Sequence, residues 1–348
     1  NGEIVNAAEL RYELEQLGNI FQGTSDTEVI AHLIQREQGL MADKILAACS
    51  QLRGAYSLVV MTKNTMYAVR DPLGLRPLCL GKVNGGYALS SESCAFTIIN
   101  AEFVRDLRPG ELLRMGKEKF ESIQFAPAGT PSICAMEYIY FSRPDSDIDG
   151  KNVHSSRKAC GRELARLEDV EADIVVGVPD SSLSASQGYA EASGLPNEMG
   201  LIKSRYVGRS FIKPRQSDRE RGVKMKLSPV RSVLAGKRVV LVDDSIVRGT
   251  TSKRIVSHLF SAGAKEVHVR IASPPLRHPC FYGIDLHSEE ELIAANRSEE
   301  EIRQYIGATS LKFLSLETMQ KILGREVCNS CFTGEYPIPI PEQSLFYD

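Results

Sequence analysis

One segment limits the folds open to this chain more than any other. The apolar run at residues 238–242 ends in two adjacent acids, Asp243 and Asp244, and a loop rich in glycine and hydroxyl groups then leads into a helix-like stretch. Continuous apolar runs that alternate with helices are typical of a parallel sheet covered on both faces. The segment therefore predicts a buried strand of an α/β domain, with both acids at its carboxyl end.

The same alternation continues on both sides of this segment. Further buried strands are expected at residues 174–178 and 267–272, and helices at residues 157–168, 184–193 and 250–262. The back portion of the chain is therefore predicted to be an α/β domain with a parallel sheet.

The front of the chain has a different texture. Residues 4–50 are mostly helical in pattern, with Leu10, Leu14 and Leu17 on one helix face, and Ser25 with Glu28 has the spacing of a capping box. Short apolar runs separated by turn signals follow up to residue 113, which predicts antiparallel strands and hairpins. We expect an α+β front portion, with a linker near residues 126–132.

Composition narrows the function classes. The 348 residues carry 42 basic and 44 acidic side chains, so the net charge of −2 gives no field that would draw the chain onto nucleic acid or an anionic membrane. No apolar run approaches the roughly 20 residues of a membrane helix, and the N-terminus lacks the features of a signal peptide. We expect a cytoplasmic protein that acts on small molecules, with no nucleic-acid or membrane partner.

The acid pair and the loop after it indicate a specific chemistry. Backbone N–H groups at a helix N-terminus form an anion site, and Gly249 would let a phosphate approach closely. Paired acids at the end of a parallel strand suit ribose hydroxyls or a Mg²⁺ ion. We therefore predict a site for a phosphorylated ribose; the alternative is an ordinary strand–helix turn with an acidic cap.

Residues 239–252 resemble the phosphoribosyl pyrophosphate signature of the type I phosphoribosyltransferases. Strings at residues 134–146, 177–182, 203–209 and 278–285 resemble one family within that group, the amidophosphoribosyltransferases in their iron–sulfur-containing bacterial form. The resemblance implies a transferase that makes 5-phosphoribosylamine from phosphoribosyl pyrophosphate and glutamine-derived ammonia, the first step of de novo purine synthesis. It also implies a homo-oligomer and feedback inhibition by purine nucleotides.

The resemblance assigns site residues in the back portion. Ser181, Asp243 and Asp244 would belong to the Mg²⁺ site, and residues 203–214 would form a basic lid, although such a stretch could also be a solvated surface loop. The residues assigned to phosphoribosyl pyrophosphate are Asp180, Ser182, Lys203, Arg205, Arg209, Ser245, Val247, Arg248, Gly249, Thr250 and Thr251.

The front portion resembles the later part of an N-terminal-nucleophile glutaminase domain. The resemblance assigns an oxyanion hole to Asn1 and Gly2 and glutamine binding to Asp26. The family nucleophile is an N-terminal Cys, but this sequence begins with Asn and its first Cys is Cys49. We therefore expect a truncated glutaminase domain that cannot hydrolyse glutamine. The expected domains are residues 1–128 (glutaminase), 129–320 (phosphoribosyltransferase) and a Cys-containing tail at 321–348.

Eight cysteines occur without an export signal, so disulfides are not expected and most of the thiols should be small buried hydrophobes. Cys328 and Cys331 form a CxxC pair, which alone is a weak signal for a redox site, a metal site or neither. The resemblance makes Cys134, Cys280, Cys328 and Cys331 the ligands of a [4Fe–4S] cluster. A Cys₄ zinc site and four buried free thiols are the alternatives.

Two other functions are compatible with the phosphoribosyl signature. A salvage phosphoribosyltransferase acting on a nucleobase would leave the front portion and the four cysteines unexplained. A non-catalytic regulator that binds phosphoribosyl pyrophosphate would need a DNA-binding element, and neither a helix-turn-helix pattern nor a basic face is evident.

Overall fold

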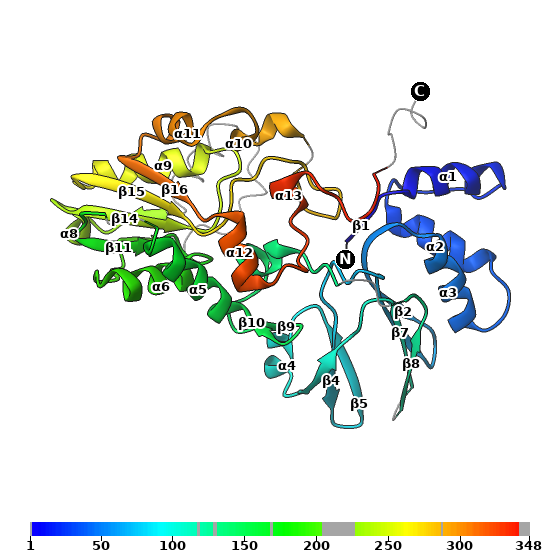
Figure 1. Cartoon of the computed structure of the whole chain (residues 1–348). Helices are drawn as coiled ribbons and strands as arrows, with labels where there is room; N and C mark the ends of the chain where they lie inside the picture. Colours follow the sequence, from blue (N-terminus) through cyan, green and yellow to red (C-terminus); the bar gives the residue numbers. More distant parts are fainter. Residues whose placement is uncertain are drawn as a thin grey trace.

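The computed structural model describes residues 2–116, 119–127, 131–167, 170–203, 227–286 and 288–340. Figure 1 shows an α+β unit, coloured blue to cyan, beside an α/β unit coloured green to orange. This arrangement confirms the fold class predicted from the sequence. None of the described helices combines the length and apolarity that crossing a bilayer requires.

The front unit is built on a five-stranded antiparallel sheet of order β1-β2-β3-β7-β8. Side chains alternate between its faces, so neighbouring residues of β3 enter different cores. Tyr67 and Val69 pack with the three front helices, whereas Ala68 packs with a smaller sheet of order β5-β4-β6. The elements are β1 (Gly2–Ile4), α1 (Ala7–Gln16), α2 (Asp26–Arg36), α3 (Met41–Gln51), β2 (Gly54–Met61), β3 (Met66–Arg70), β4 (Cys79–Val83), β5 (Gly86–Ser90), α4 (Cys94–Ile98), β6 (Glu102–Asp106), β7 (Glu111–Met115) and β8 (Phe120–Gln124).

Two local predictions for the front helices are wrong. Leu17 follows the last residue of α1 and is 63% exposed, so it does not extend the buried face made by Leu10 and Leu14. The predicted capping box does not form either. Ser25 caps α2 by accepting from the Thr27 amide, but the Glu28 carboxylate turns back to accept from the Gln22 and Gly23 amides. Those two amides precede the cap, and they bind the Glu28 carboxylate in place of the Ser25 amide that a capping box would use.

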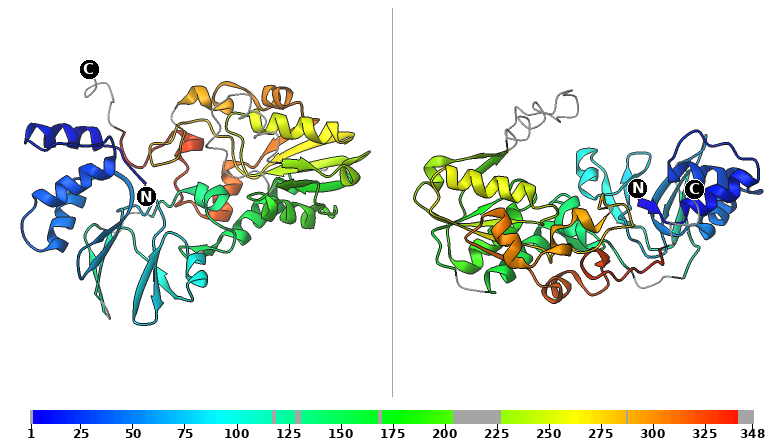
Figure 2. Two further views of the ribbon diagram at one scale, coloured as in Figure 1. Left: turned by 180° about the vertical axis from the view of Figure 1, so that it is seen from behind. Right: turned by 90° about the horizontal axis from the view of Figure 1, so that it is seen from above.

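The back unit contains a parallel sheet of order β11-β14-β15-β16, covered by helices on both faces (Figures 1 and 2). In β14, Val240 and Val242 enter the core that includes Leu164 of α5, whereas Val239 and Leu241 enter the core around α9. Burial on both faces explains the continuous apolar run. The main elements are α5 (Val153–Ala165), β11 (Ile174–Gly177), α6 (Leu183–Ser193), β14 (Arg238–Asp243), α9 (Thr250–Ser261), β15 (Glu266–Ile271), α11 (Glu299–Ile306) and β16 (Ser310–Phe313).

Shorter elements surround this sheet. A single π-helical turn, η1 (Glu137–Phe141), precedes α5, and a small ribbon links the two. The remaining described elements are β9 (Asp147–Ile148), β10 (Lys151–Asn152), β12 (Leu201–Lys203), β13 (Leu227–Pro229), α8 (Arg231–Leu234), η2 (Glu289–Glu291), α10 (Ile293–Asn296), α12 (Leu316–Leu323) and α13 (Ser330–Thr333).

Helices α5 and α6 cross with almost no space between their backbones. A Cβ atom on Gly161 would lie 1.9 Å from the Ala185 carbonyl oxygen, and one on Gly188 would lie 1.9 Å from the Lys158 carbonyl oxygen. Both helices are therefore restricted to glycine at the crossing. Since α6 begins directly after the loop that carries Ser181 and Ser182, this contact also fixes the position of that loop.

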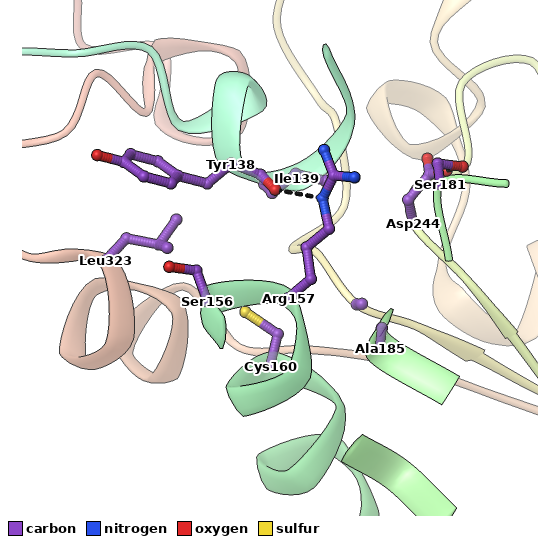
Figure 3. A pocket seen from close by; sticks show the side chains of 10 residues that line it. Tyr138, Ile139, Ser156, Arg157, Cys160, Ser181, Ala185, Asp244 and Leu323 are labelled. Atoms are coloured by element: carbon purple, nitrogen blue, oxygen red, sulfur yellow. Dashed lines mark hydrogen bonds between the residues drawn. The ribbon is translucent and has the colours of Figure 1, made fainter. Parts of the chain in front are cut away.

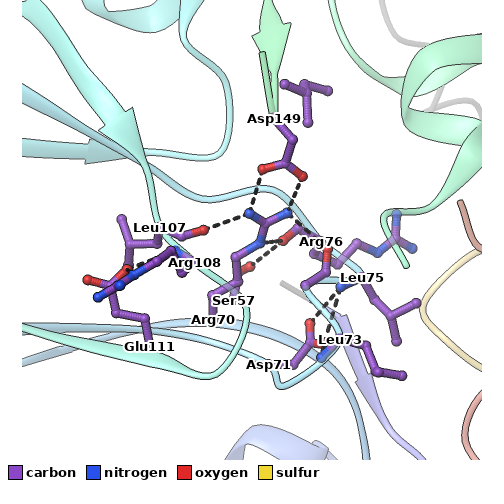
Figure 4. A network of polar contacts seen from close by, with 12 residues as sticks. Ser57, Arg70, Asp71, Leu73, Leu75, Arg76, Leu107, Arg108, Glu111 and Asp149 are labelled. Carbon is purple, nitrogen blue, oxygen red and sulfur yellow. Dashed lines mark hydrogen bonds and ion pairs between the residues drawn. The ribbon is translucent and has the colours of Figure 1, made fainter. Parts of the chain in front are cut away.

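A partly buried ion pair joins the two units (Figure 4). Arg70, at the end of β3 and 1% exposed, donates two hydrogen bonds of 2.8 Å to the carboxylate of Asp149 in the β9–β10 turn. Its remaining donors bind the carbonyl oxygens of Gly74, Arg76 and Leu107. Arg70 thus ties a turn of the back unit to three loop carbonyls of the front unit.

Asp149→Asn should destabilise the protein by about 2 kcal/mol, because it removes the carboxylate charge that is hydrogen-bonded to the buried Arg70 guanidinium. Asparagine tolerates the positive φ of 46° at this position, so the backbone should not add to the loss. Urea unfolding measures the change. Asp145→Asn is the control, because its ion pair with Arg143 is exposed and should contribute little. Equal stabilities of the two variants would contradict a joining role for Arg70.

Candidate active site

The acid pair lies where the sequence predicts it, at the carboxyl end of β14. Asp243 is the last residue of the strand, and its Oδ1 accepts from the Ser182 hydroxyl at 3.0 Å and from the Asp244 amide at 2.9 Å. The Asp244 carboxylate accepts from the hydroxyls of Ser181 and of Ser245, the latter at 2.6 Å. Two neighbouring carboxylates are therefore held by three serine hydroxyls.

Burial raises the pKa of Asp243 well above its ordinary value, and the adjacent Asp244 charge raises it further. The pKa of Asp244 is also raised by burial, while hydroxyl donors and the positive charge of Arg157 act in the opposite direction. Ionising both carboxylates is costly unless a positive group or hydroxyl donors approach them. The pair is thus suited to binding a cation or a polyhydroxyl ligand.

Sheet topology brings together residues that are far apart in sequence. Strands β11 and β14 are adjacent and parallel, with Gly177 opposite Val242, so the loops that follow them leave the sheet at the same edge. That arrangement places Ser181 and Ser182 on the acid pair. In the same loop, Asp180 follows a cis peptide bond and accepts from Lys203 Nζ at 2.7 Å.

The loop after β14 enters α9 as predicted. Gly249 precedes the helix with φ of +72°, and a Cβ atom there would lie 2.7 Å from Ile293, so both its conformation and its surroundings require glycine. The amides of the first turn of α9, which begins with Thr250 and Thr251, have no partner within the helix and can bind an anion. In the same loop, Val247 accepts from the Ile293 amide, and Arg248 binds Glu291 at 2.6 Å.

Two of the predicted phosphoribosyl pyrophosphate residues, Arg205 and Arg209, lie outside the described residues. So does the proposed lid beyond Lys203. Asn1 also lies outside them.

Arg157 is a residue that the sequence analysis missed. Figure 3 shows its side chain rising from α5 between the π-helical turn and the loop residues Ser181 and Asp244, at a small cavity of about 10 Å³. The sequence does contain one indication that Arg157 is unusual. Arg157 occupies the apolar face of α5 together with Val153, Cys160 and Leu164, where a charged side chain is unexpected.

The predicted glutamine residues lie in the front unit, on the wall of a separate cavity of about 840 Å³. Gly2 pairs with Tyr56 in the sheet, and Asp26 begins α2, where its Oδ2 accepts from the Ile4 amide at 3.1 Å. Phe281 and Asp285 of the back unit line the same cavity. This cavity is therefore lined by both units, whereas the acid pair lies in the back unit.

The four predicted cysteine ligands converge from three segments of the chain. Cys134 and Cys328 form an isolated parallel bridge, and the thiols of Cys134, Cys280 and Cys328 all act on the pKa of Cys331, which burial raises well above its ordinary value. All four are free thiols. In the part of the chain that the structure describes, no group of three or more His, Cys, Asp or Glu side chains has an arrangement that could hold a metal ion.

Comparison with known proteins identifies both units. Residues 1–97 match the family model described as a glutamine amidotransferase domain, and residues 154–273 match the phosphoribosyl transferase domain. The fold and the two family matches therefore define a glutamine amidotransferase domain joined to a phosphoribosyltransferase domain.

Full-length relatives specify the family. The chain is 55% identical to amidophosphoribosyltransferase of Bacillus subtilis over 99% of its own length and 74% of the relative's. It is 47% identical to the enzyme of Methanothermobacter thermautotrophicus, over 100% of its length and 75% of the relative's. This chain belongs to the amidophosphoribosyltransferase family of enzymes, as the sequence predicts. These relatives do not favour a salvage enzyme or a non-catalytic regulator.

A solved structure supports the same assignment. The glutamine phosphoribosylpyrophosphate amidotransferase of B. subtilis, complexed with ADP and GMP, superposes with a TM-score of 0.93 at 55% identity. The match covers 99% of this chain and 78% of that one.

Proposed function

We propose that this chain catalyses the transfer of ammonia to C1 of phosphoribosyl pyrophosphate, giving 5-phosphoribosylamine and pyrophosphate at the start of purine synthesis. The observation that carries the proposal is the meeting of Ser181, Ser182, Asp243 and Asp244 at one sheet edge, beside the N-terminus of α9. The helix supplies donors for a phosphate, and the acids accept from ribose hydroxyls or bind a cation.

The roles proposed for the residues of the two loops follow from where those loops lie beside the acid pair. Ser245, Val247, Arg248, Gly249, Thr250 and Thr251 form the loop and first turn that would hold the 5-phosphate. Asp180, Ser181 and Ser182 would contact the pyrophosphate, and Asp243 and Asp244 with Ser181 would hold Mg²⁺. The ion would supply charge that stabilises the leaving pyrophosphate. Lys203, which binds Asp180, would add positive charge beside the pyrophosphate, and the family resemblance assigns the same role to Arg205 and Arg209.

In this family the front unit would supply the ammonia, and the sequence contains no N-terminal cysteine to act as the nucleophile. We propose that Asn1 and Gly2 form the oxyanion hole and that Asp26 binds the glutamine α-amino group. The cavity that contains Gly2 and Asp26 supports this assignment. The functional units would then be residues 1–128 and 129–320, with residues 321–348 as the Cys-containing tail.

The enzyme is tested most directly with ammonium salt as the nitrogen donor, because that reaction does not depend on glutamine hydrolysis. Pyrophosphate should appear only when phosphoribosyl pyrophosphate, Mg²⁺ and ammonium are all present, and chelation of the metal should abolish it. Substituting a nucleobase for ammonium should give no product. Turnover of a nucleobase in its place would refute the proposal in favour of a salvage activity.

We further propose that Cys134, Cys280, Cys328 and Cys331 hold a [4Fe–4S] cluster that ties the tail to both units. Four thiol donors from three segments are the donor set of an iron–sulfur cluster and also of a Cys₄ zinc site. Binding of either would have to draw the thiols into an arrangement that the described side chains do not have here. Arg76 lies close enough to lower the pKa of Cys134 against the effect of burial, so a buried cation accompanies the thiols. A cluster here would act structurally.

Protein purified without oxygen should be brown and contain about four irons per chain. Cys331→Ser should remove the colour and lower the melting temperature. Cys49→Ser should leave the colour unchanged and cost little stability, because Cys49 lies in the separate core of the front unit. Metal analysis and visible absorption measure these changes. One zinc per chain without iron would eliminate the cluster in favour of the zinc alternative.

Inhibition by nucleotides and assembly into an oligomer are further parts of the proposed function. The B. subtilis structure contains ADP and GMP, which supports purine nucleotides as feedback inhibitors here. We also propose a homo-oligomer in the cytoplasm.

A further inference from the structure

Arg157 is held rigidly, although it is a charged side chain inside a core. It is 4% exposed, and it donates from Nε to the Tyr138 carbonyl oxygen at 2.6 Å and from one terminal nitrogen to the Ser142 carbonyl oxygen at 2.7 Å. Both acceptors belong to the π-helical turn or its end. A π turn leaves carbonyls out of the regular helical pattern, and the guanidinium satisfies two of them.

The guanidinium of Arg157 also lies at the same cavity as Asp244 of the acid pair. Arg157, Ser181 and Asp244 line the same small cavity, and Figure 3 shows the guanidinium directed between the π turn and the two loop residues. The positive charge of Arg157 acts on Asp244. Arg157 itself is buried, and two of its nitrogens are bound to carbonyls of the π turn and its end.

A fixed positive charge near the acid pair reduces the repulsion between its two carboxylates. Two adjacent carboxylates in a low-dielectric site repel each other, and the serine hydroxyls supply only dipoles. A positive charge that is anchored at the same cavity offsets part of that repulsion. Arginine suits this role because its planar fork can bind two carbonyls and still face the acid.

We propose that Arg157 is a positioning residue for phosphoribosyl pyrophosphate: anchored to the carbonyls of Tyr138 and Ser142, it compensates the charge of Asp244 and keeps the acid pair ready to bind the sugar and its metal. The inference rests on the proposed function of the acid pair. Arg157 contacts no substrate in this account and acts through Asp244.

Two substitutions separate this role from a purely structural one. Arg157→Lys retains the positive charge but cannot bind both carbonyls as the fork does, whereas Arg157→Met removes charge and hydrogen bonds together. Both variants should therefore lose melting temperature. Only Arg157→Met should weaken the binding of Mg²⁺–phosphoribosyl pyrophosphate, by at least about tenfold, and Arg157→Lys should stay within about threefold of the parent.

Calorimetric titration of the full chain with Mg²⁺ and phosphoribosyl pyrophosphate measures Kd, and the binding stoichiometry corrects for any unfolded fraction. Arg70→Met is the matched control: it removes another buried arginine that binds carbonyls, remote from the acid pair, so it should lower the melting temperature and leave Kd unchanged. Equal Kd values for Arg157→Lys and Arg157→Met would overturn the proposal. Failure of the parent chain to bind would instead refute the proposed function.

Discussion

Asp243→Asn is expected to lower kcat/KM for phosphoribosyl pyrophosphate by roughly 100-fold or more with ammonium as donor, because it removes one of two charges that would face metal and sugar. The side chain keeps its volume, and an amide oxygen can still accept from Ser182 and from the Asp244 amide. Pyrophosphate release measures the loss. Asp244→Asn should behave in the same way.

The same substitution should not lower the melting temperature. The pKa of Asp243 is raised in the folded state, so above the unfolded-state pKa its ionisation opposes folding, and a neutral amide removes that penalty. Loss of activity with stability retained is the expected signature of a functional acid. Asp173→Asn, at the opposite end of the parallel sheet beside Arg238, should leave turnover intact. A folded Asp243→Asn variant with more than half of the parent activity would show that the acids are misassigned.

Gly161→Ala is expected to destabilise the protein by about 3 kcal/mol, although alanine in a helix is normally favoured over glycine by about 1 kcal/mol. The sign reverses because the new Cβ atom would lie 1.9 Å from a backbone oxygen of α6, which cannot rotate away as a side chain could. The helices must therefore separate. The denaturation midpoint in urea measures the loss.

Separation of α5 and α6 should also disturb the hydrogen bonds that Ser181 and Ser182 donate to the acid pair. The loop with Ser181 and Ser182 leads directly into α6, so the affinity for phosphoribosyl pyrophosphate should fall together with stability. Gly23→Ala is the matched control, because a Cβ atom there would meet only the end of the Glu28 side chain, at 3.4 Å. An unchanged midpoint for Gly161→Ala would mean that the two helices can adjust without cost.

The parallel sheet and the acid pair could be predicted because each depends on local pattern. A strand buried on both faces has to be apolar throughout, and a parallel strand presents its following loop at the ligand-binding edge. The short strand β16 (Ser310–Phe313) was missed because its alternate residues, Ser310 and Lys312, are not apolar. The family resemblance, rather than spacing, supplied the roles of Ser181 and Ser182.

Contacts that depend on distant or irregular structure could not be predicted. The position of Arg157 follows from a π turn that has no sequence signature, and Asp244, which lines the same cavity, lies far along the chain. The Glu28 carboxylate could accept either from the Ser25 amide or from the Gln22 and Gly23 amides, and sequence spacing alone predicted the wrong partner. The convergence of the cysteines likewise depends on tertiary structure, since CxxC spacing accounts for only two of the four.

The bridge between Cys134 and Cys328 has a consequence for biosynthesis. The Cys328 amide donates to the Ile133 carbonyl oxygen, and the Cys328 carbonyl oxygen accepts from the Ala135 amide. A ribosome adding about 5–20 residues per second needs on the order of ten to forty seconds to make the roughly 190 residues between the two segments. Throughout that interval the thiol of Cys134, which is buried in the finished protein, is exposed to solvent and to oxidants. Reducing conditions therefore matter most to this chain while it is still being synthesised.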